Sequence, residues 1–177
     1  MGLSIHYKGC FSKGASLQAM IEEVTDIAEI YKWKYSVYET AFDMENLGRA
    51  DFNNRIYGII FVAPKCEPVY LSFLSNGRMS NEMHLQHRGN STDKSKYLYM
   101  LSTKTQYGGM QVHLTIIQML RYLSEKYFSE FELYDEGGYW ETGDVNILAE
   151  TFKRYDDLMD AVAGALAERE RRPRVPA

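Results

Sequence analysis

The chain has 177 residues, of which 45% are hydrophobic and 25% charged, and its formal net charge is −4. This length is typical of one globular domain, and the composition excludes a disordered, collagen-like or disulfide-scaffold protein. The charge is uneven: residues 130–160 carry ten acidic and two basic side chains, whereas residues 1–129 and 161–177 each have a net charge of +2. Because such an acidic segment repels polyanions, no nucleic-acid partner is expected.

Features that would direct the chain to a membrane or an oxidising compartment are missing from the sequence. Cys10 and Cys66 are the only cysteines, too few for a disulfide framework and typical of a reducing compartment. We find no signal-peptide pattern, no myristoylation pattern and no apolar run of about 18 residues. The sequence therefore predicts a cytoplasmic protein with no membrane partner.

The first 87 residues predict one helix and several strands. The helix covers residues 16–31, where apolar side chains recur at three- and four-residue spacing. Alternating or continuous apolar stretches predict strands at 4–8, 33–39, 56–63, 69–75 and 78–87, the last being the weakest. Asn76-Gly77 precedes that last strand and tolerates the positive φ of a tight hairpin turn. Residues 41–54 and 88–95 are polar and predict loops.

The second half repeats the order strand, helix, strand, at residues 97–106, 110–127 and 131–136. With a constant offset of 96 residues the apolar positions coincide, as Met20 does with Ile116 and Val24 with Leu120. This self-similarity favours a βαβ duplication about a pseudo-two-fold axis, with halves 1–87 and 96–168. The alternative is that both stretches share only the hydrophobic periodicity common to such units.

These elements predict the α+β class, with a mixed, largely antiparallel sheet and helices on one face. Duplicated units of this kind can leave a cleft between their halves, as in ferredoxin-like and GyrI-like ligand-binding proteins. That analogy concerns the fold, and a fold does not determine a function.

A long helix is predicted over residues 144–169, so that residues 1–168 form one domain and residues 169–177 a flexible basic tail. Its apolar residues alternate at four- and three-residue spacing, the pattern of a coiled-coil seam: Leu148, Phe152, Tyr155, Met159, Val162 and Leu166. We favour a helix that packs along its own sheet, because sustained coiled coils usually need more heptads. The alternative is a self-association seam that forms a homodimer.

The most unusual segment is residues 134–144, Tyr-Asp-Glu-Gly-Gly-Tyr-Trp-Glu-Thr-Gly-Asp, with four carboxylates, three aromatic rings and three glycines. Carboxylates beside aromatic rings can bind a cationic or hydroxyl-bearing ligand, or have raised pKa values that suit acid–base chemistry. The structural alternative is that Trp140 fills the edge of the core while Thr142 or Asp144 caps the final helix.

This segment, together with residues 125–128 and 131–136, resembles a family of uncharacterised bacterial proteins. The similarity extends to Ser4-Ile5-His6-Tyr7 and Lys104-Thr105-Gln106, and its distinctive motif is Tyr-Trp-Glu-Thr-Gly-Asp at 139–144. The resemblance implies a bacterial, cytoplasmic origin. It brings no known activity and no catalytic residues.

The strand-to-helix junction at residues 104–109 is a second candidate site. Free amides at a helix N-terminus attract anions, and Lys104 would reinforce that attraction. However, the sequence contains neither the G-x-G-x-x-G nor the Walker lysine motif, so an ordinary tight connection is favoured over a phosphate site.

Isolated reactive side chains are weaker candidates. Cys10 shares a strand face with His6 and Lys8, but a bystander thiol is favoured over a nucleophile. A strand would place His84 and His87 on opposite faces, and no zinc motif occurs, so neither a metal nor a cofactor is expected. His113 lies in an apolar helix and is expected in the core.

The favoured functional hypothesis is a non-enzymatic module that binds a small molecule in a cleft lined by acidic and aromatic residues. The proposed lining residues are Lys104, Gln106, Glu136, Tyr139, Trp140 and Glu141. One alternative is a protein-interaction or self-associating protein that uses the final helix. A second alternative is a carboxylate-dependent enzyme with Glu136 or Glu141 as general acid or base.

Overall fold

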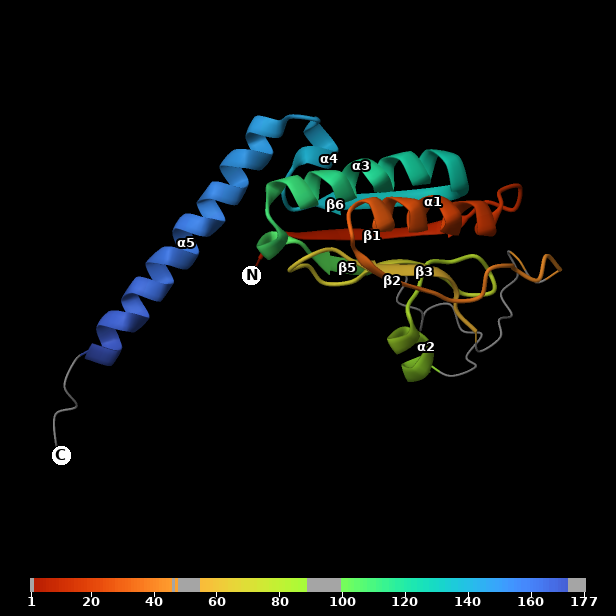
Figure 1. Cartoon of the computed structure of the whole chain (residues 1–177), viewed down its shortest axis with the longest axis horizontal. Helices are drawn as coiled ribbons and strands as arrows, with labels where there is room; N and C mark the ends of the chain where they lie inside the picture. The colour runs from red at the N-terminus through yellow and green to blue at the C-terminus, as the bar shows by residue number, and fades with distance from the viewer. Residues whose placement is uncertain (1, 46, 48–54, 89–99, 172–177) are drawn as a thin grey trace.

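The computed structural model describes residues 2–45, 47, 55–88 and 100–171 (Figure 1). Its helices are α1 (Leu17–Ile30), α2 (Glu82–Arg88), α3 (Met110–Tyr127), α4 (Tyr139–Thr142) and α5 (Val145–Arg171). Its strands are β1 (Ser4–Phe11), β2 (Lys34–Val37), β3 (Tyr57–Val62), β4 (Val69–Phe73), β5 (Leu101–Lys104) and β6 (Phe128–Asp135). A single 3₁₀ turn, Gln106–Gly108, connects β5 to α3.

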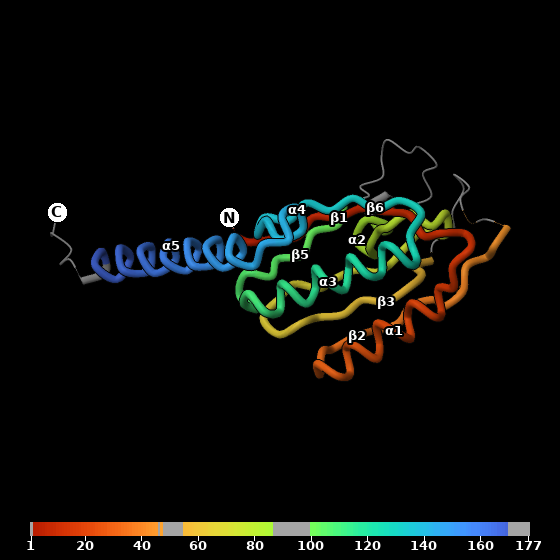
Figure 2. Tube along the Cα trace, turned by 90° about the horizontal axis from the view of Figure 1, so that it is seen from above, coloured from red at the N-terminus to blue at the C-terminus, as the bar shows by residue number. Residues whose placement is uncertain are grey.

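The strands form two antiparallel three-stranded sheets, in the orders β5-β1-β6 and β2-β3-β4. The two sheets contact each other where β4 lies beside β5. The amide of Glu67, before β4, donates to the carbonyl of Lys104 at 2.9 Å, and the amide of Met79, after β4, donates to the carbonyl of Gly9 in β1 at 3.0 Å. Seen from above, β6, β1, β5, β3 and β2 follow one another across the molecule (Figure 2). The predicted α+β class with antiparallel strands is confirmed.

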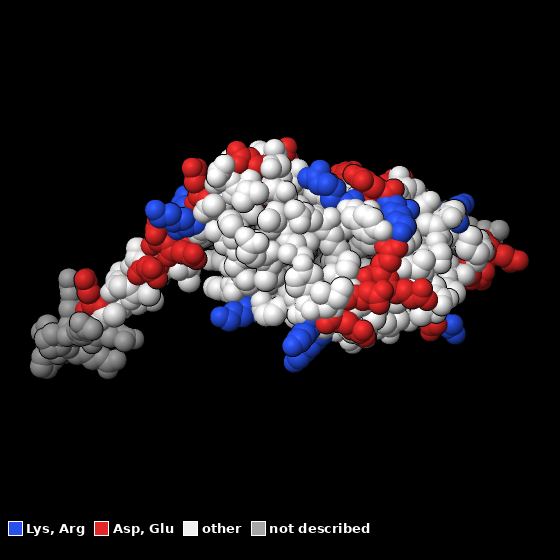
Figure 3. Space-filling view, turned by 45° about the horizontal axis from the view of Figure 1, so that its top comes forward, with Lys and Arg blue, Asp and Glu red and all other residues white. Residues whose placement is uncertain are grey.

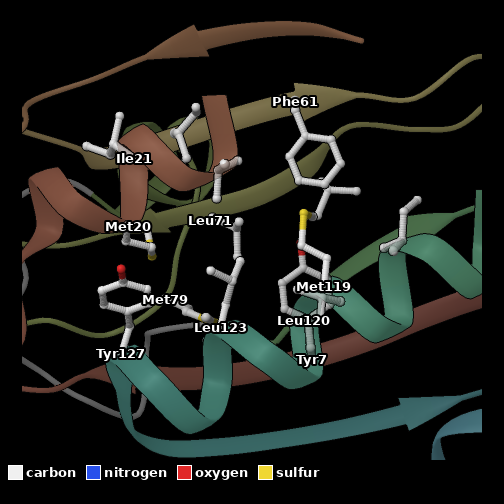
Figure 4. Packing of buried hydrophobic residues seen from close by; sticks show 14 of the residues in the cluster. Tyr7, Met20, Ile21, Phe61, Leu71, Met79, Met119, Leu120, Leu123 and Tyr127 are labelled. Carbon is white, nitrogen blue, oxygen red and sulfur yellow. The ribbon is translucent and has the colours of Figure 1, made fainter. Parts of the chain in front are cut away.

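Helices α1 and α3 contact each other and pack against the strands around one hydrophobic core. The helical spacing places Met20, Val24, Ile117 and Leu120 on the buried faces, as predicted. Side chains from α1, α3 and strands of both sheets meet in this cluster (Figure 4). The two halves of the chain therefore share a single core. Helix α2 lies on the other side of β2 and β3 from α1 (Figure 1).

Both strand–helix–strand units are present, as β1-α1-β2 and β5-α3-β6, and the 96-residue offset places α1 within α3. Met20 and its counterpart Ile116 are both fully buried. The correspondence ends after the helices, because Tyr31 is exposed whereas its counterpart Tyr127 is buried. Helix α3 runs directly into β6, whereas α1 ends in a turn in which Lys32 has a φ of 56°.

The strand predicted over residues 78–87 is wrong, because most of it is helix α2. The Asn81 side chain accepts a hydrogen bond from the amide of His84 at 2.9 Å, and this cap begins the helix. Only Arg78 and Met79 pair as strand residues, after a turn in which Gly77 has the expected positive φ of 83°. The sequence signal that was missed is the capping asparagine.

The metal prediction depended on that strand. On α2, His84 and His87 are three residues apart and share a helix face rather than lying on opposite faces of a strand. The His87 side chain lies outside the described residues. Among the described residues no three potential metal-binding side chains come together. Residues 48–54 and 89–99, which include most of the two predicted loops, also lie outside the described part of the chain.

Helix α5 begins and ends close to its predicted bounds, but it does not pack along a sheet. Leu148 and Phe152 are buried against the body, and from residue 156 to residue 169 every side chain is exposed. The helix projects away from the rest of the molecule (Figure 1). The favoured prediction for this helix is therefore wrong, because the body offers partners only to its first turns. No helix in the described part of the chain is long and apolar enough to cross a membrane.

Candidate functional site

The segment of residues 134–144 is organised around the buried carboxylate of Asp135, at the end of β6. Its Oδ1 accepts a hydrogen bond from the amide of Gly137 at 2.7 Å. Its Oδ2 accepts from the amides of Tyr139 at 2.9 Å and Trp140 at 3.1 Å. These are the otherwise unpaired donors of the turn and of the first residues of α4. Asp135 therefore holds the chain in its turn from β6 into α4.

Asp135 also belongs to a buried polar cluster with Thr105 and His113. His113 Nε2 lies 2.9 Å from Asp135 Oδ1, at ion-pair distance, and its Nδ1 lies 2.7 Å from Thr105 Oγ1. Burial raises the pKa of the Asp135 carboxyl, but His113 and the amides of Trp140 and Gly137 outweigh burial and hold this pKa below its ordinary value.

This Thr–His–Asp cluster has the residue types of a catalytic site but no access to substrate. The side chains of His113 and Asp135 are both fully buried. The ring of Phe152 lies edge-on to the His113 ring, with their centroids 5.5 Å apart. The cluster thus ties the residue that follows β5 to α3 and β6 beneath the first turns of α5. The prediction that His113 is a core residue is confirmed.

The remaining polar residues of the segment also bond to the backbone. Glu141 Oε1 accepts a hydrogen bond from the amide of Asp135 at 3.0 Å. Asp144 Oδ1 accepts one from the amide of Asn146 at 2.8 Å, which caps α5, and the Asp144 amide donates to Thr142 Oγ1 at 3.1 Å. These contacts match the structural alternative for the segment.

Trp140 lies on the helix-covered side of the β5-β1-β6 sheet. Its ring meets the Phe131 ring edge-on at 5.8 Å, and the Arg121 guanidinium of α3 lies 4.3 Å from its centre. Arg121 also donates a hydrogen bond to the Trp140 carbonyl at 2.7 Å. Tyr139 packs between the main core and the smaller cluster that buries Leu148. Both rings fill the edge of the core.

Glu136 lies on the opposite side of that sheet. Its Oε2 accepts a hydrogen bond from the amide of Ser4 at 2.8 Å, and its Oε1 lies 3.4 Å from His6 Nε2. His6 stacks on Tyr134, whereas its neighbour Tyr7 faces Phe131 in the core, as alternation along a strand requires.

Lys104, the last residue of β5, and Gln106, in the 3₁₀ turn that follows, lie near this end of β1 on its other side. Lys104 is directly opposite Ser4 in the sheet, and a Cβ added to Gly2 would meet both Lys104 and Gln106. Gln106 is buried, and its Oε1 has no hydrogen-bond partner among the described residues. Of the six residues predicted to line a cleft, the structure thus brings Lys104, Gln106 and Glu136 near one another. Trp140 is on the other face.

Two hollows in the described surface involve other residues. The larger, of about 620 Å³, lies between the end of β2 and α2 and is lined by Val37, Tyr38, Glu39, Arg55, Ile56, Glu82, Leu85 and Gln86. The smaller, of about 160 Å³, is lined by Lys8, Gly9, Arg78, Glu130, Phe131 and Glu132. Neither includes any of the six predicted residues. The larger hollow was missed because it depends on α2, which the sequence predicted as a strand.

The two thiols are poor nucleophiles. Burial raises the pKa of the Cys10 thiol, although the nearby Arg78 acts in the opposite direction. Burial likewise raises the pKa of Cys66 to about 11. Because the thiolate is the reactive form, these shifts favour the predicted bystander role of Cys10 over a catalytic one.

The exposed part of α5 carries the second half of the predicted heptad seam. Met159, Val162 and Leu166 are 43%, 47% and 57% exposed, and the adjacent Leu158 is 51% exposed. Charged side chains on α5 gather near the body, and an uncharged stretch follows them (Figure 3). That stretch is residues 161–167, Ala-Val-Ala-Gly-Ala-Leu-Ala. This combination of length, exposure and apolar spacing is typical of a helix that pairs with another helix.

Comparison of the chain with protein-family models, curated proteins and solved structures gave no match. The resemblance of residues 139–144 to a bacterial family therefore stays a prediction, as does the bacterial origin it implies.

Proposed function

We propose that this chain is a self-associating protein and that α5 is its interaction element. The observation that carries the proposal is the position of the seam relative to the body. Leu148 and Phe152 are buried by the body, but the same seam continues through Met159, Val162 and Leu166 with no cover from any described residue. Pairing with another helix would remove these side chains from water.

Helix energetics support pairing. In proteins, most of the stability of a helix comes from packing of its apolar face rather than from helix propensity. Residues 156–169 lack such packing, and full burial of a Leu, Val or Met side chain is worth about 1.5–3 kcal/mol. Association itself costs about 4–15 kcal/mol, and the exposed seam covers only two heptads. We therefore expect a dimer with a micromolar rather than a nanomolar dissociation constant.

The contacts of the acidic segment favour this proposal over the other hypotheses. Glu136 and Glu141 each accept a hydrogen bond from a backbone amide, which gives both carboxylates a structural role. Glu136 and Trp140 lie on opposite faces of the sheet, so they do not line a common cleft. A carboxylate enzyme or an acidic-aromatic binding site at residues 134–144 is correspondingly less favoured.

Light scattering over a concentration series tests the proposal. The wild type should pass from one chain to two as concentration rises, and a Met159→Lys/Val162→Lys variant should remain a monomer because two charges enter the seam. Ala161→Lys is the matched control, since this exposed residue lies on the far side of the same helix and should leave association unchanged. A wild type that stays monomeric from nanomolar to millimolar concentration would refute the proposal.

Small-molecule binding is a second candidate, supported by the hollow beside α2. Its volume of about 620 Å³ lies within the range of about 300–1,000 Å³ usual for ligand sites. Burial and the nearby Glu82 carboxylate raise the pKa of Tyr38 to about 12, and its protonated phenol can act as a hydrogen-bond donor. With Glu39 and Glu82 as acceptors, the site favours ligands that carry both donors and acceptors.

A thermal-shift screen with polar metabolites, including amines and amino sugars, tests this second candidate. A true ligand should stabilise the wild type and lose its effect in Glu82→Gln, while Glu45→Gln on the exposed surface serves as control. If no compound raises the melting temperature, the hollow has no such function.

A further inference from the structure

We infer that α5 pairs with α5 of a second copy in antiparallel orientation, with the pair centred between Asp160 and Ala161. This inference rests on the proposed self-association and specifies the orientation and register of the partner helix. In this register Tyr155 lies opposite Leu166 of the second copy, and Met159 lies opposite Val162 of the second copy.

The body sets the register. Leu148 and Phe152 belong to the seam but are buried against the body, so a partner helix cannot reach them. The part of the seam that a partner can cover begins at Tyr155, which is only partly buried, and ends at Leu166. In an antiparallel pair centred midway between those two residues, every seam residue from Tyr155 to Leu166 lies opposite a seam residue of the second copy. Moving the partner helix by one heptad toward the body would require contact with Phe152. Moving it by one heptad away from the body would leave Tyr155 and Met159 uncovered.

The charge pattern sets the orientation. Residues 150–160 carry four carboxylates and two basic side chains, and residues 161–167 carry no charge. A parallel pair places each acidic stretch beside its own copy. In the antiparallel pair Asp156 and Asp157 lie beside the uncharged stretch, and of the carboxylates in residues 150–160 only Asp160 stays level with its own copy. Asp156 and Asp157 are then offset from their copies by about 13.5 and 10.5 Å along the axis, beyond the Debye length of about 8 Å at physiological ionic strength.

The positions of the two bodies point to the same orientation. A parallel pair would bring both bodies to one end of the helices. There the carboxylates of Glu141 and Asp144, close to the start of each α5, would face their own copies. The antiparallel pair holds the bodies at opposite ends of the helices.

Site-directed disulfide formation tests the orientation. In a Cys10→Ser/Cys66→Ser background, a protein with Tyr155→Cys is mixed with one carrying Leu166→Cys and oxidised. An antiparallel pair should give mainly the mixed 155–166 disulfide. Same-site disulfides, which join residue 155 or residue 166 to the same residue of the second copy, should be rare. In the antiparallel pair residue 155 and its copy are offset by about 16.5 Å along the axis, whereas a disulfide needs Cα atoms about 4.4–6.8 Å apart. A parallel pair would give same-site disulfides only.

A distance measurement outside the seam keeps the inference testable if either cysteine disturbs pairing. Spin labels on Glu168→Cys in the same background should be offset from each other by about 22 Å along the helix axis in the antiparallel pair. In the parallel pair the two labels should have no axial offset, because they lie level on helices whose axes are about 8–10 Å apart. Same-site disulfides or a short label distance would overturn the antiparallel inference and leave self-association standing. A monomer at all concentrations would remove both.

Discussion

The two halves of α5 continue one apolar pattern into opposite environments. Leu148, in the first half, is 0% exposed, whereas Leu166, in the second half, is 57% exposed. Both lie on the same heptad seam of the same helix. A regular apolar face thus predicts that something covers it, and says nothing about whether the cover belongs to the same chain.

The anchoring of the first half explains where the change occurs. Leu3, His113 and the short helix α4 surround Leu148 and Phe152, and Asp135 holds that neighbourhood together through backbone amides. After Phe152 the direction of α5 takes it away from all of these elements (Figure 1). The packing of the helix is therefore decided within its first two turns.

The largest expected effect on stability is the difference between alanine substitutions at Leu148 and at Leu166. Leu148→Ala leaves a cavity in a fully buried site and should lower the free energy of unfolding by about 2–5 kcal/mol. Leu166→Ala should change it by less than about 0.5 kcal/mol in the monomer, because the side chain is already exposed. Urea unfolding at low protein concentration measures both. Equal losses in the two variants would show that the distal half of α5 is also packed against the body.

The buried carboxylate of Asp135, beneath the first half of α5, should dominate the loss of stability at acidic pH. The folded pKa of Asp135 lies below its ordinary value of 3.8, so its contribution to stability is present above that value and is lost as the pH falls through the lowered folded pKa. Asp135→Asn should cost about 1–3 kcal/mol near neutral pH, because the buried amides and His113 lose a charged acceptor. The same variant should show less acid-induced loss below pH 3.8 than the wild type.

Stability measured across the acid range provides the comparison for Asp135. Asp157→Asn on the exposed face of α5 is the matched control and should follow the wild-type curve. An Asp135→Asn curve parallel to wild type below pH 3.8 would contradict the assigned role of this carboxylate.

The cap at the start of α5 should have a smaller effect. Asp144→Ala removes the acceptor for the Asn146 amide and should cost about 1 kcal/mol. Asp160→Ala removes an exposed carboxylate from the middle of the same helix and should be nearly neutral. Thermal unfolding followed by circular dichroism compares the two, and equal melting temperatures would argue against capping by Asp144.

The smallest expected effect is a gain in stability at Gly164. A Cβ added at Gly164, in the distal half of α5, would meet no atom within 4 Å. Gly164→Ala should therefore stabilise the helix by about 0.5–1 kcal/mol and increase its helical signal. Gly137→Ala, beneath the proximal half, should have the opposite sign, since its Cβ would lie 2.6 Å from Leu148 Cδ1. A destabilising Gly164→Ala would indicate a neighbour that packs on that face.

Much of the fold follows from local patterns in the sequence. The three- and four-residue apolar spacing predicted α1 and α3 and the residues that they bury, and the turn at Gly77 was predicted from its tolerance of positive φ. The strand predicted over residues 78–87 is wrong at α2, because Asn81 provides a helix cap that strand propensity does not take into account. The site residues were harder to predict, because Lys104, Gln106 and Glu136 meet only through strand pairing across β1.

Periodicity, caps and turn residues act over a few neighbouring residues, so the amino-acid order alone determined α1, α3 and α5, the apolar faces of these helices and the long seam of α5. The tertiary structure decided which of those faces are covered. It directed the carboxylates of Asp135 and Glu141 to backbone amides and buried Leu148 and Phe152. It also left the seam beyond Tyr155 in water. Burial depends on elements that are distant in the chain, and no local pattern encodes where those elements end.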